Sequence, residues 1–412
     1  MKSASNIIRI VATLLLVLSL QAWGAAKYGV LHAFGRGKDG AGPFGLLTLD
    51  NQGNLYGVTG GGGDGCSGGY GCGVVFELMP HKNGLWGEKL LFQYSGDGTN
   101  TNLWGGLALD GTGNLYGTLQ GQGSGVFDLS HGSSGWNFGV LYSDGAGPGV
   151  LIDGLGNLYG DIGPGQYKYY GAIAELSPGS TGWTYTQLYS FCGQSKCPDG
   201  YDLPAPPVWD RQGNMFGTTV YGGIGQPACW IAYGCGVVFE MTSNGDGTRS
   251  YTVLHRFLQF SEKDGQTPEG GLVMDASGNF YGTTVYGGKY NVGMVFRLRH
   301  TAGSWRLENM YDFPDCKIGC APAGTLVLDK AGNLYGEAGG GLVDCGPDSC
   351  GVLFKLSPQK SGKWKYSVVH KFNGKDGGFP GYGLIVDGKG NLFGVTTSFG
   401  KYGYGVAFKL TP

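Results

Sequence analysis

The segment Asp275-Ala276-Ser277-Gly278-Asn279-Phe280-Tyr281-Gly282 recurs through the chain in near-copies. The shared pattern is D-x-x-G-N-Φ-(Y/F)-G, where Φ is an apolar residue. Successive copies begin 43 to 65 residues apart, and the seven copies lie at 50–57, 110–117, 153–160, 210–217, 275–282, 329–336 and 387–394. Such a period is typical of a repeat architecture, in which each copy forms one supersecondary unit.

The residue types of this motif predict a tight turn between two strands. An Asp side chain accepts a hydrogen bond from the backbone two residues on, and Gly and Asn tolerate the left-handed conformation that closes a hairpin. An apolar-aromatic pair such as Phe280-Tyr281 suits a partly buried strand, and Gly282 allows close approach of a neighbour. The alternative is a repeated Asp–Asn cation site, but the alternating acids of an EF-hand are missing. We expect no metal and no cofactor.

The residues around the motif complete a unit of four strands. In the fifth repeat, strands are predicted at 271–274, 280–284, 293–298 and 307–313, with Trp305 before the last. Four short strands per repeat are typical of a propeller blade. The sequence therefore predicts an all-β fold, a seven-bladed β-propeller with four antiparallel strands per blade, as a single domain over residues 25–412.

The two ends of the chain predict how the ring closes. The chain stops after the third strand of the seventh repeat, and residues 28–34 resemble the fourth strand at 251–257. An N-terminal strand that completes the last blade would remove the open edges of the ring.

Composition and charge exclude several classes of protein. Gly accounts for 85 of the 412 residues and aromatic residues for 13%, without a period of three, so neither collagen nor a disordered Gly-rich tract fits. The formal net charge is −2 and the chain has no basic run, which argues against nucleic-acid binding.

The N-terminus has the pattern of a secretory signal. Lys2 and Arg9 precede an apolar run at 10–20, and 22–24 offers small residues for cleavage before Ala25. We therefore expect a signal peptide at 1–24 and a secreted or periplasmic monomer without membrane contact after cleavage. The alternative is a retained membrane anchor, although the run is short for a bilayer span.

Ten cysteines fit an exported protein, and they fall into five local pairs. The pairs are Cys66/Cys72, Cys192/Cys197, Cys229/Cys235, Cys316/Cys320 and Cys345/Cys350. Pairing of near neighbours is the simplest interpretation, and closing so short a loop stabilises by roughly 2 kcal/mol in the chain-entropy model. Zinc sites are the alternative, but no C-x-x-C pair occurs and no His lies close by.

The complete unit resembles the GloVer tandem repeat of bacterial exported proteins. It has the form F-x-G-x-D-G-x-x-P-x-x-G-L-x-x-D-x-x-G-N-L-Y-G-T-T-x-x-G-G…G-V-V-F-x-L-x-P, and the resemblance extends over residues 28–412. It implies secretion and a propeller-like fold, and it transfers no activity and no catalytic residue. The D-x-x-G-N-x-Y core is also similar to NHL-type propeller repeats, which supports the fold by analogy.

In a propeller, the fourth-to-first and second-to-third loops share one face, and all five cysteine pairs fall in these loops. Because binding residues concentrate on loops held by a rigid scaffold, we expect this face to be functional. The alternative is that the disulfides only stabilise long Gly-rich loops. Aromatic platforms for carbohydrate or protein are predicted at Tyr221, Tyr286 and Trp230.

Carboxylates on and beside these loops are the remaining candidates for ligand-binding or catalytic residues. Asp-Gly pairs recur in the fourth-to-first loops, where Asp199 and Asp264 are candidate ligand-binding residues, although the same pairs also suit simple turns. Asp161 and Glu337 replace Thr or Val directly after the motif, and such a pair suits acid–base chemistry in glycan cleavage. His32, His255 and His370 occupy positions of packed strand residues.

The sequence therefore predicts a binding module for an extracellular glycan or protein, with a carbohydrate-active lyase or hydrolase as the alternative. The Walker loop and H-E-x-x-H are missing from the sequence, so we expect binding rather than catalysis.

Overall fold

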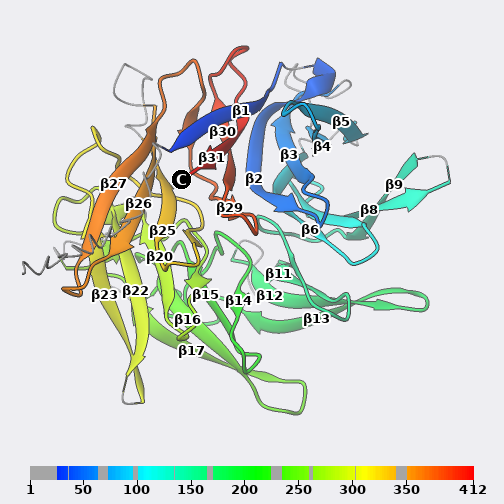
Figure 1. Ribbon diagram of the computed structural model, residues 1–412. Helices are drawn as coiled ribbons and strands as arrows, with labels where there is room; N and C mark the ends of the chain where they lie inside the picture. The colour runs from blue at the N-terminus through cyan, green and yellow to red at the C-terminus, as the bar shows by residue number, and fades with distance from the viewer. Residues whose placement is uncertain are drawn as a thin grey trace, which may run out of the picture.

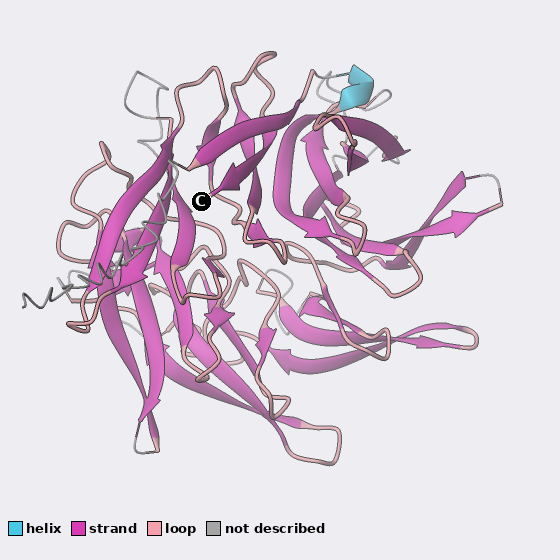
Figure 2. Cartoon of the chain, viewed as in Figure 1, coloured by secondary structure: helices cyan, strands magenta, loops and turns pink. Residues whose placement is uncertain are grey.

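The computed structural model describes residues 26–412 except 36, 64–72, 96–100, 134, 165–169, 224–233, 259–262, 302 and 340–349. Seven antiparallel sheets follow one another around a central axis (Figure 1). Nearly all regular structure is strand, and the 3-10 turn η1 (Gly37–Asp39) is the only helical segment within the described ranges (Figure 2). The predicted seven-bladed all-β propeller is confirmed.

Each blade contains four strands in chain order from the axis outward. Blades one to three are β2 (Ala41–Leu49), β3 (Leu55–Gly61), β4 (Val74–Pro80), β5 (Trp86–Gln93); β6 (Asn102–Leu109), β7 (Leu115–Gln120), β8 (Gly125–Gly132), β9 (Gly135–Tyr142); and β10 (Leu151–Ile152), β11 (Leu158–Asp161), β12 (Ala172–Gly179), β13 (Gly182–Ser190). Blades four and five are β14 (Val208–Trp209), β15 (Met215–Thr219), β16 (Val237–Ser243), β17 (Arg249–Arg256); and β19 (Val273–Met274), β20 (Phe280–Thr284), β22 (Met294–Thr301), β23 (Ser304–Asp312).

Blade six follows the same order, and blade seven takes its outermost strand from the N-terminus. Three further strands lie at the loop face. Blade six is β24 (Val327–Leu328), β25 (Leu334–Ala338), β26 (Val352–Pro358) and β27 (Trp364–Lys371). Blade seven is β29 (Ile385–Val386), β30 (Leu392–Ser398), β31 (Val406–Thr411) and β1 (Lys27–Ala33), with β28 (Gly378–Pro380) also pairing with β30. A small ribbon forms between β18 (Gly265–Gln266) and β21 (Tyr286–Gly287). The predicted first strand of repeat five is shorter than expected, at two residues.

The D-x-x-G-N motif forms a turn that is hydrogen-bonded within itself. In the first copy, Asp50 Oδ1 accepts from the backbone N–H groups of Gln52 and Asn54, both at 2.8 Å. Asp50 Oδ2 accepts from Asn54 Nδ2 at 2.8 Å and from the Tyr56 hydroxyl at 3.2 Å. The motif Gly has φ between +78° and +94° in all seven copies, as the turn requires. The motif Asn keeps negative φ, so it contributes a side-chain bond rather than the left-handed backbone that its type also permits.

In six of the seven copies, the last Gly of the motif makes room for a Phe ring rather than for another backbone, whereas Gly160 of the third copy lies against the Gly149 carbonyl. A Cβ on Gly57 would lie 2.5 Å from Cζ of Phe76, a residue of the third strand, and a Cβ on Gly282 would lie 2.5 Å from Cζ of Phe296. Both Phe side chains are fully buried. The close approach expected at this Gly is therefore present, and the Phe of the G-V-V-F segment is its cause.

The N-terminal strand closes the ring. β1 pairs antiparallel with β31, with Tyr28 opposite Leu410 and Ala33 opposite Val406, and the two strands lie side by side in Figure 1. The Tyr28 ring stacks on His370 of blade six at 3.7 Å between centroids, and its hydroxyl donates to the Asp376 carbonyl at 2.7 Å. The prediction that this strand completes blade seven is confirmed.

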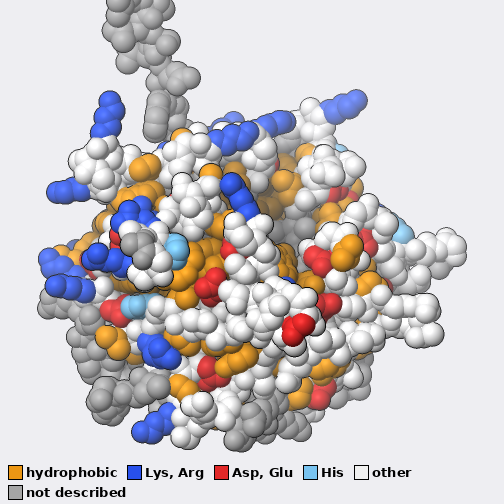
Figure 3. All heavy atoms as spheres, turned by 90° about the horizontal axis from the view of Figure 1, so that it is seen from below, with side chains coloured by type: hydrophobic (Ala, Val, Ile, Leu, Met, Phe, Trp, Pro, Cys, Tyr) orange, Lys and Arg blue, Asp and Glu red, His pale blue; other side chains and the backbone are white. Residues whose placement is uncertain are grey.

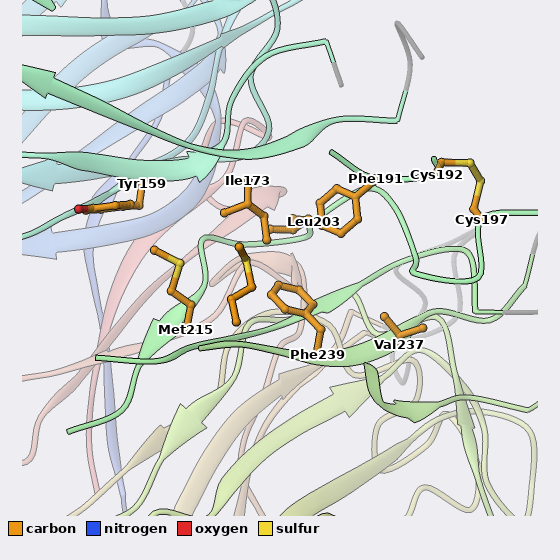
Figure 4. Close-up of a cluster of buried hydrophobic side chains, with 10 residues drawn as sticks. Tyr159, Ile173, Phe191, Cys192, Cys197, Leu203, Met215, Val237 and Phe239 are labelled. Carbon is orange, nitrogen blue, oxygen red and sulfur yellow. A yellow bond between two sulfur atoms is a disulfide. The ribbon is translucent and has the colours of Figure 1, made fainter. Parts of the chain in front are cut away.

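The core lies between neighbouring blades. One cluster joins Tyr159 and Ile173 of blade three to Met215 and Phe239 of blade four, and the Cys192–Cys197 disulfide lies at one end of it (Figure 4). Because every blade buries both faces against its neighbours, stability depends on all seven contacts around the ring.

The outer surface carries no large patch of one charge on the side seen in Figure 3, where basic and acidic side chains are interspersed with uncharged ones. In the part of the chain that the structure describes, no helix is long and apolar enough to cross a membrane. The predicted signal peptide lies outside the described residues.

Candidate functional site

A cavity of about 1190 Å³ opens at the channel mouth. Both families of long loops line it, and the D-x-x-G-N turns do not, so the two loop families share one face as predicted. Every blade contributes lining residues from the segment that leads into or begins its innermost strand. Six positions before the motif Asp, these residues are Phe44, Trp104, Gly147, Pro204, Glu269, Ala323 and Gly381. The ring of equivalent positions identifies this cavity as the upper end of the central channel.

Aromatic rings form one part of the cavity wall. The Phe44 ring lies between Trp104 and Tyr382, at 3.9 Å from each ring centroid. These three residues belong to blades one, two and seven, so they form a continuous aromatic arc across two blade contacts. Tyr221, predicted as a platform, also lines the cavity and lies 5.4 Å from the Tyr201 ring.

Carboxylates form another part of the wall, on the loops and strands that follow blade two through blade four. Asp144, Asp161, Asp202 and Glu269 line the cavity, whereas Lys, Arg and His are missing from its described lining residues. Burial and the nearby charge of Asp202 raise the pKa of Asp161 to about 7, against the opposing effect of the Ala172 and Leu203 backbone N–H groups. Burial also raises the pKa of Asp202, and burial with the Asp202 charge raises that of Glu269. Among the described lining residues, negative charge is therefore concentrated without a basic partner.

Glu337 lies behind the cavity wall rather than on it. Its side chain is 1% exposed, and Oε2 accepts a hydrogen bond from the Gly383 backbone N–H at 2.8 Å. Burial raises the pKa of Glu337 to about 8, although the backbone N–H groups of 381–383 oppose this shift. The structure thus brings Asp161 to the cavity and does not bring Glu337 there with it.

The position that Asp161 and Glu337 share connects one blade to the next wherever its side chain is polar. Three other repeats have Thr there and two have Val, and Thr218 Oγ1 donates to the Gly270 carbonyl at 3.0 Å, while Thr118 Oγ1 accepts from the Gly149 N–H at 3.0 Å. The carboxylates at this position make the same kind of contact, Asp161 with Leu203 and Glu337 with Gly383. Their departure from Thr therefore has a structural role in addition to any functional one.

The loop Asp-Gly carboxylates bind the preceding strand. His32 Nε2 lies 2.7 Å from Asp39 Oδ1, and His255 Nε2 lies 3.0 Å from Asp264 Oδ1. Asp199 accepts from the Tyr189 hydroxyl at 2.8 Å. Asp199 and Asp264 are outside the cavity lining, and the turn interpretation accounts for their contacts. The histidines are packed on the fourth strands, as the sequence indicates, and hold these turns.

The remaining predicted residues lie apart from the cavity or outside the described chain. Tyr286 is 42% exposed on the same face without lining the cavity. Cys192–Cys197 and Cys316–Cys320 form the predicted bonds, and Cys235 and Cys350 are also disulfide-bonded. Their predicted partners Cys229 and Cys345, together with Cys66, Cys72 and Trp230, lie outside the described residues.

Sequence reasoning missed most of the cavity wall. Phe44, Trp104, Asp202, Glu269 and Tyr382 were not singled out, because they lie outside the motif and differ between repeats. A signal does exist, since the residue after the loop Pro faces the channel, as Pro43-Phe44 and Pro268-Glu269 show. Aligning repeats one, five, six and seven on that Pro would have identified Phe44 and Glu269 as channel residues.

The fold and the cavity define a class, the β-propellers with a ligand-sized cavity at the loop face. Residues 228–412 match the family model of the Gloeobacter/Verrucomicrobia repeat, so the resemblance to GloVer is confirmed for this part of the chain. No curated protein matches the sequence.

Solved structures with a similar fold include propellers of different kinds. A structure described as YCF48 bound to D1 peptide is 11% identical with a TM-score of 0.53, covering 95% of this chain and 98% of that one. A protein from Lactobacillus plantarum is 12% identical with a TM-score of 0.50, covering 84% and 98%. A luciferin-regenerating enzyme is 14% identical with a TM-score of 0.46, covering 75% and 91%. At such identities, the first two support the fold alone.

Proposed function

We propose that this protein is an exported binding module whose channel-mouth cavity takes a positively charged ligand, either a glycan with free amino groups or a Lys- or Arg-bearing segment of a protein. The observation that carries the proposal is the composition of the cavity wall. Four carboxylates and four aromatic rings line it, and its described lining contains no basic side chain.

Electrostatics favours a cation in this cavity. Burial raises the pKa values of Asp161, Asp202 and Glu269, and repulsion from the charge of Asp202 adds to the shifts of Asp161 and Glu269. A bound cation replaces this repulsion by attraction. The Phe44, Trp104 and Tyr382 rings add faces that attract ammonium or guanidinium groups and stack on sugar rings.

Export is part of the proposal. The disulfides at Cys192–Cys197 and Cys316–Cys320 are typical of an oxidising compartment, and the N-terminal 24 residues have the features of a signal peptide. N-terminal sequencing of protein from the periplasm or medium should begin at Ala25. A mature protein that retains Met1 would contradict this part.

Calorimetric titration with a matched pair of glycans tests the ligand class. Chitosan oligomers carry amino groups that are protonated at mildly acidic pH, and chitin oligomers of equal length carry neutral acetamides. We expect the chitosan oligomer to bind and the chitin oligomer to bind at least about tenfold more weakly. An arginine-rich peptide forms a third arm, and tighter binding of this peptide would identify a protein segment as the ligand.

The Asp202→Asn/Glu269→Gln double variant tests the residues. It should lose about tenfold in affinity or more, because two charges of the wall are removed at nearly constant volume. Asp246→Asn, on the exposed β16–β17 hairpin, is the charge-matched control and should bind as the wild type does. Equal affinity of the double variant and the wild type would exclude this cavity as the binding site.

A carbohydrate-active lyase or hydrolase is the second candidate, and one observation favours it. Asp161 lines the cavity and has a pKa of about 7, which suits proton transfer near neutral pH. Release of reducing ends or unsaturated products from glycans, abolished in Asp161→Asn, would support it. Binding without turnover supports the binding module.

A further inference from the structure

A second pocket of about 460 Å³ lies between blades four and five, lined by D-x-x-G-N turns and therefore on the face opposite the cavity. The turns of repeats four and five form its rim, with Asp210, Arg211 and Ser277 among the lining residues. Glu240 of β16 and Trp305 of β23 form its interior, and His300 of β22 lies beside Trp305 at 4.9 Å between ring centroids.

Repeat four lacks the Tyr hydroxyl that other repeats place beside the charged residue of the third strand, which is Glu240 in repeat four. In repeat one, the Tyr56 hydroxyl donates to Glu77 at 3.0 Å, and Lys89 Nζ lies 3.8 Å from the same carboxylate. Repeat four has Phe216 in place of that Tyr and Thr252 opposite Glu240 in place of that Lys. Glu240 has no ion-pair partner among the described residues. Its carboxylate is therefore left to the pocket and to the neighbouring blade.

Repeat seven shows that this combination is specific to repeat four. It also has Phe in place of Tyr, at Phe393, but its third strand carries Lys409, whose Nζ lies 5.8 Å from the centre of the Phe393 ring. In repeat seven, the absence of the Tyr hydroxyl is therefore combined with a cation of the chain itself, Lys409. In repeat four, the equivalent residue is the acid Glu240, and a cation would have to come from outside.

The pocket has an aromatic interior around that carboxylate. The Trp305 indole N–H acts to lower the pKa of the Glu240 carboxyl against the larger effect of burial, and the Trp305 ring lies 5.3 Å from Phe216 and 5.7 Å from Phe280. Phe216 and Phe280 stack at 4.2 Å between ring centroids and are fully buried, so the Trp305 ring packs against a fixed pair of aromatic rings. A carboxylate beside a fixed indole ring is the arrangement that binds organic cations.

The other charged groups on the rim leave this carboxylate as the main anchor. Asp210 is saturated by its own turn, since it accepts from the N–H groups of Gln212 and Asn214 at 2.8 Å and from Asn214 Nδ2 at 2.9 Å. Arg211 is exposed, and His300 also lines the pocket, close enough for its charge to act to lower the pKa of the Glu240 carboxyl. A ligand that enters this pocket therefore contacts Glu240 and the aromatic rings.

We propose that this pocket binds an organic cation, an alkylammonium or guanidinium group on a short apolar stem, with Glu240 as its counter-ion and Trp305 as its aromatic face. Such a group is supplied by a small amine or by a Lys or Arg side chain of another protein. The site is independent of the proposed function at the channel mouth, because it lies on the other face and shares no residue with it.

Nuclear magnetic resonance of the Trp305 indole N–H gives a readout at the site itself, with the signal assigned by its loss in Trp305→Phe. We expect n-butylguanidinium to shift this signal with saturation and the neutral analogue n-butanol to leave it unchanged. Acetyl-Gly-Arg-Gly-amide distinguishes the sources, since tighter binding of the peptide indicates a protein side chain as the natural guest.

Two variants and a matched control complete the test. Glu240→Gln keeps the acceptor for Trp305 and removes the charge, so butylguanidinium should bind about tenfold more weakly. Phe216→Tyr supplies the hydroxyl that Glu77 receives in repeat one and should also weaken binding without loss of stability. Glu175→Gln, in the equivalent position of blade three, should bind as the wild type does. Wild-type affinity in Glu240→Gln, equal binding of butanol, or no shift with butylguanidinium would overturn the proposal.

Discussion

The Glu337 carboxylate at the end of β25 accepts a hydrogen bond of 2.8 Å from the Gly383 backbone N–H, where the next blade begins. This bond joins blade six to blade seven and places a carboxylate where most other repeats have Thr or Val. Burial holds the pKa of Glu337 at about 8, so the folded protein keeps this group protonated well above the pH at which an unfolded chain loses its proton.

The first prediction concerns the pH dependence of stability. Because the pKa of Glu337 is raised from 4.5 to about 8 on folding, its contribution is fully present below pH 4.5 and is lost as pH rises through about 8. Glu337→Gln is neutral at every pH and can still accept from Gly383. At pH 8, this variant should have a free energy of unfolding on the order of 2 kcal/mol above that of the wild type, and it should therefore unfold at a higher temperature. At pH 5, the two proteins should differ little.

Thermal unfolding followed by circular dichroism between pH 5 and 8 measures this effect. Below that window the motif carboxylates act in the opposite sense, since hydrogen bonds of the turn lower the pKa of Asp275. Asp315→Asn, an exposed loop acid, is the control. A Glu337→Gln curve parallel to that of the wild type across the window would show that Glu337 does not titrate there.

A second prediction concerns the pH dependence of binding at the channel mouth. A cation favours ionised carboxylates, so affinity for an arginine-rich peptide should increase as pH rises through about 7, where Asp161 loses its proton. The guanidinium groups stay charged throughout this range. Asp161→Asn should reduce this increase and leave a remainder due to Asp202 and Glu269, whose pKa values are also raised. Calorimetry at pH 5.5 and 8 measures it, and an unchanged increase in Asp161→Asn would contradict it.

A third prediction concerns ring closure by Tyr28. Its ring stacks on His370 at 3.7 Å and its hydroxyl donates to the Asp376 carbonyl at 2.7 Å, so Tyr28→Ala removes two contacts between blades six and seven. We expect a loss of about 2–3 kcal/mol in the free energy of unfolding, and about 1 kcal/mol for Tyr28→Phe.

Denaturant unfolding measures these losses, with Tyr290→Ala as the control. Tyr290 is 48% exposed on a loop, and its removal should change stability by no more than about 0.5 kcal/mol. Equal stability of Tyr28→Ala and Tyr290→Ala would mean that β1 adds little to the closed ring.

A fourth prediction separates the two kinds of Gly within one turn. Gly390 has φ of +84° and Gly388 does not have positive φ, and a Cβ at either position meets no atom within 4 Å. Gly390→Ala should therefore lose about 1–2 kcal/mol through backbone conformation alone, and Gly388→Ala should be nearly neutral. Denaturant midpoints of the two variants measure the difference. Equal midpoints would show that the left-handed conformation does not constrain this turn.

The fold was readable from sequence because its signal is local and repeated seven times. Within each turn, the Asp side chain bonds to atoms at most six residues away, as Asp50 does with Asn54 and Tyr56. Tyr28 was identified as part of a closing strand because residues 28–34 copy a fourth strand seen elsewhere in the chain. Near-neighbour pairing at Cys192–Cys197 followed from the same locality.

The candidate site was only partly readable, because its residues differ between repeats and meet across blades. Asp161 and Tyr221 were predicted and line the cavity, while the aromatic arc of Phe44, Trp104 and Tyr382 was not foreseen. Glu337 matched Asp161 in repeat position but lies behind the wall. No feature of a single repeat tells which of two carboxylates at the same position faces the channel.

The sequence by itself determined the repeat, the turn chemistry, the number of blades and the strand that closes the ring, since each depends on residues close in the chain or copied along it. Only the tertiary structure decided which side chains share a cavity, because closing the ring brings Phe44 of blade one against Tyr382 of blade seven. The concentration of acids at the channel mouth, without bases among its described lining residues, is likewise a property of the closed ring, since burial and mutual repulsion arise only when loops of different blades converge.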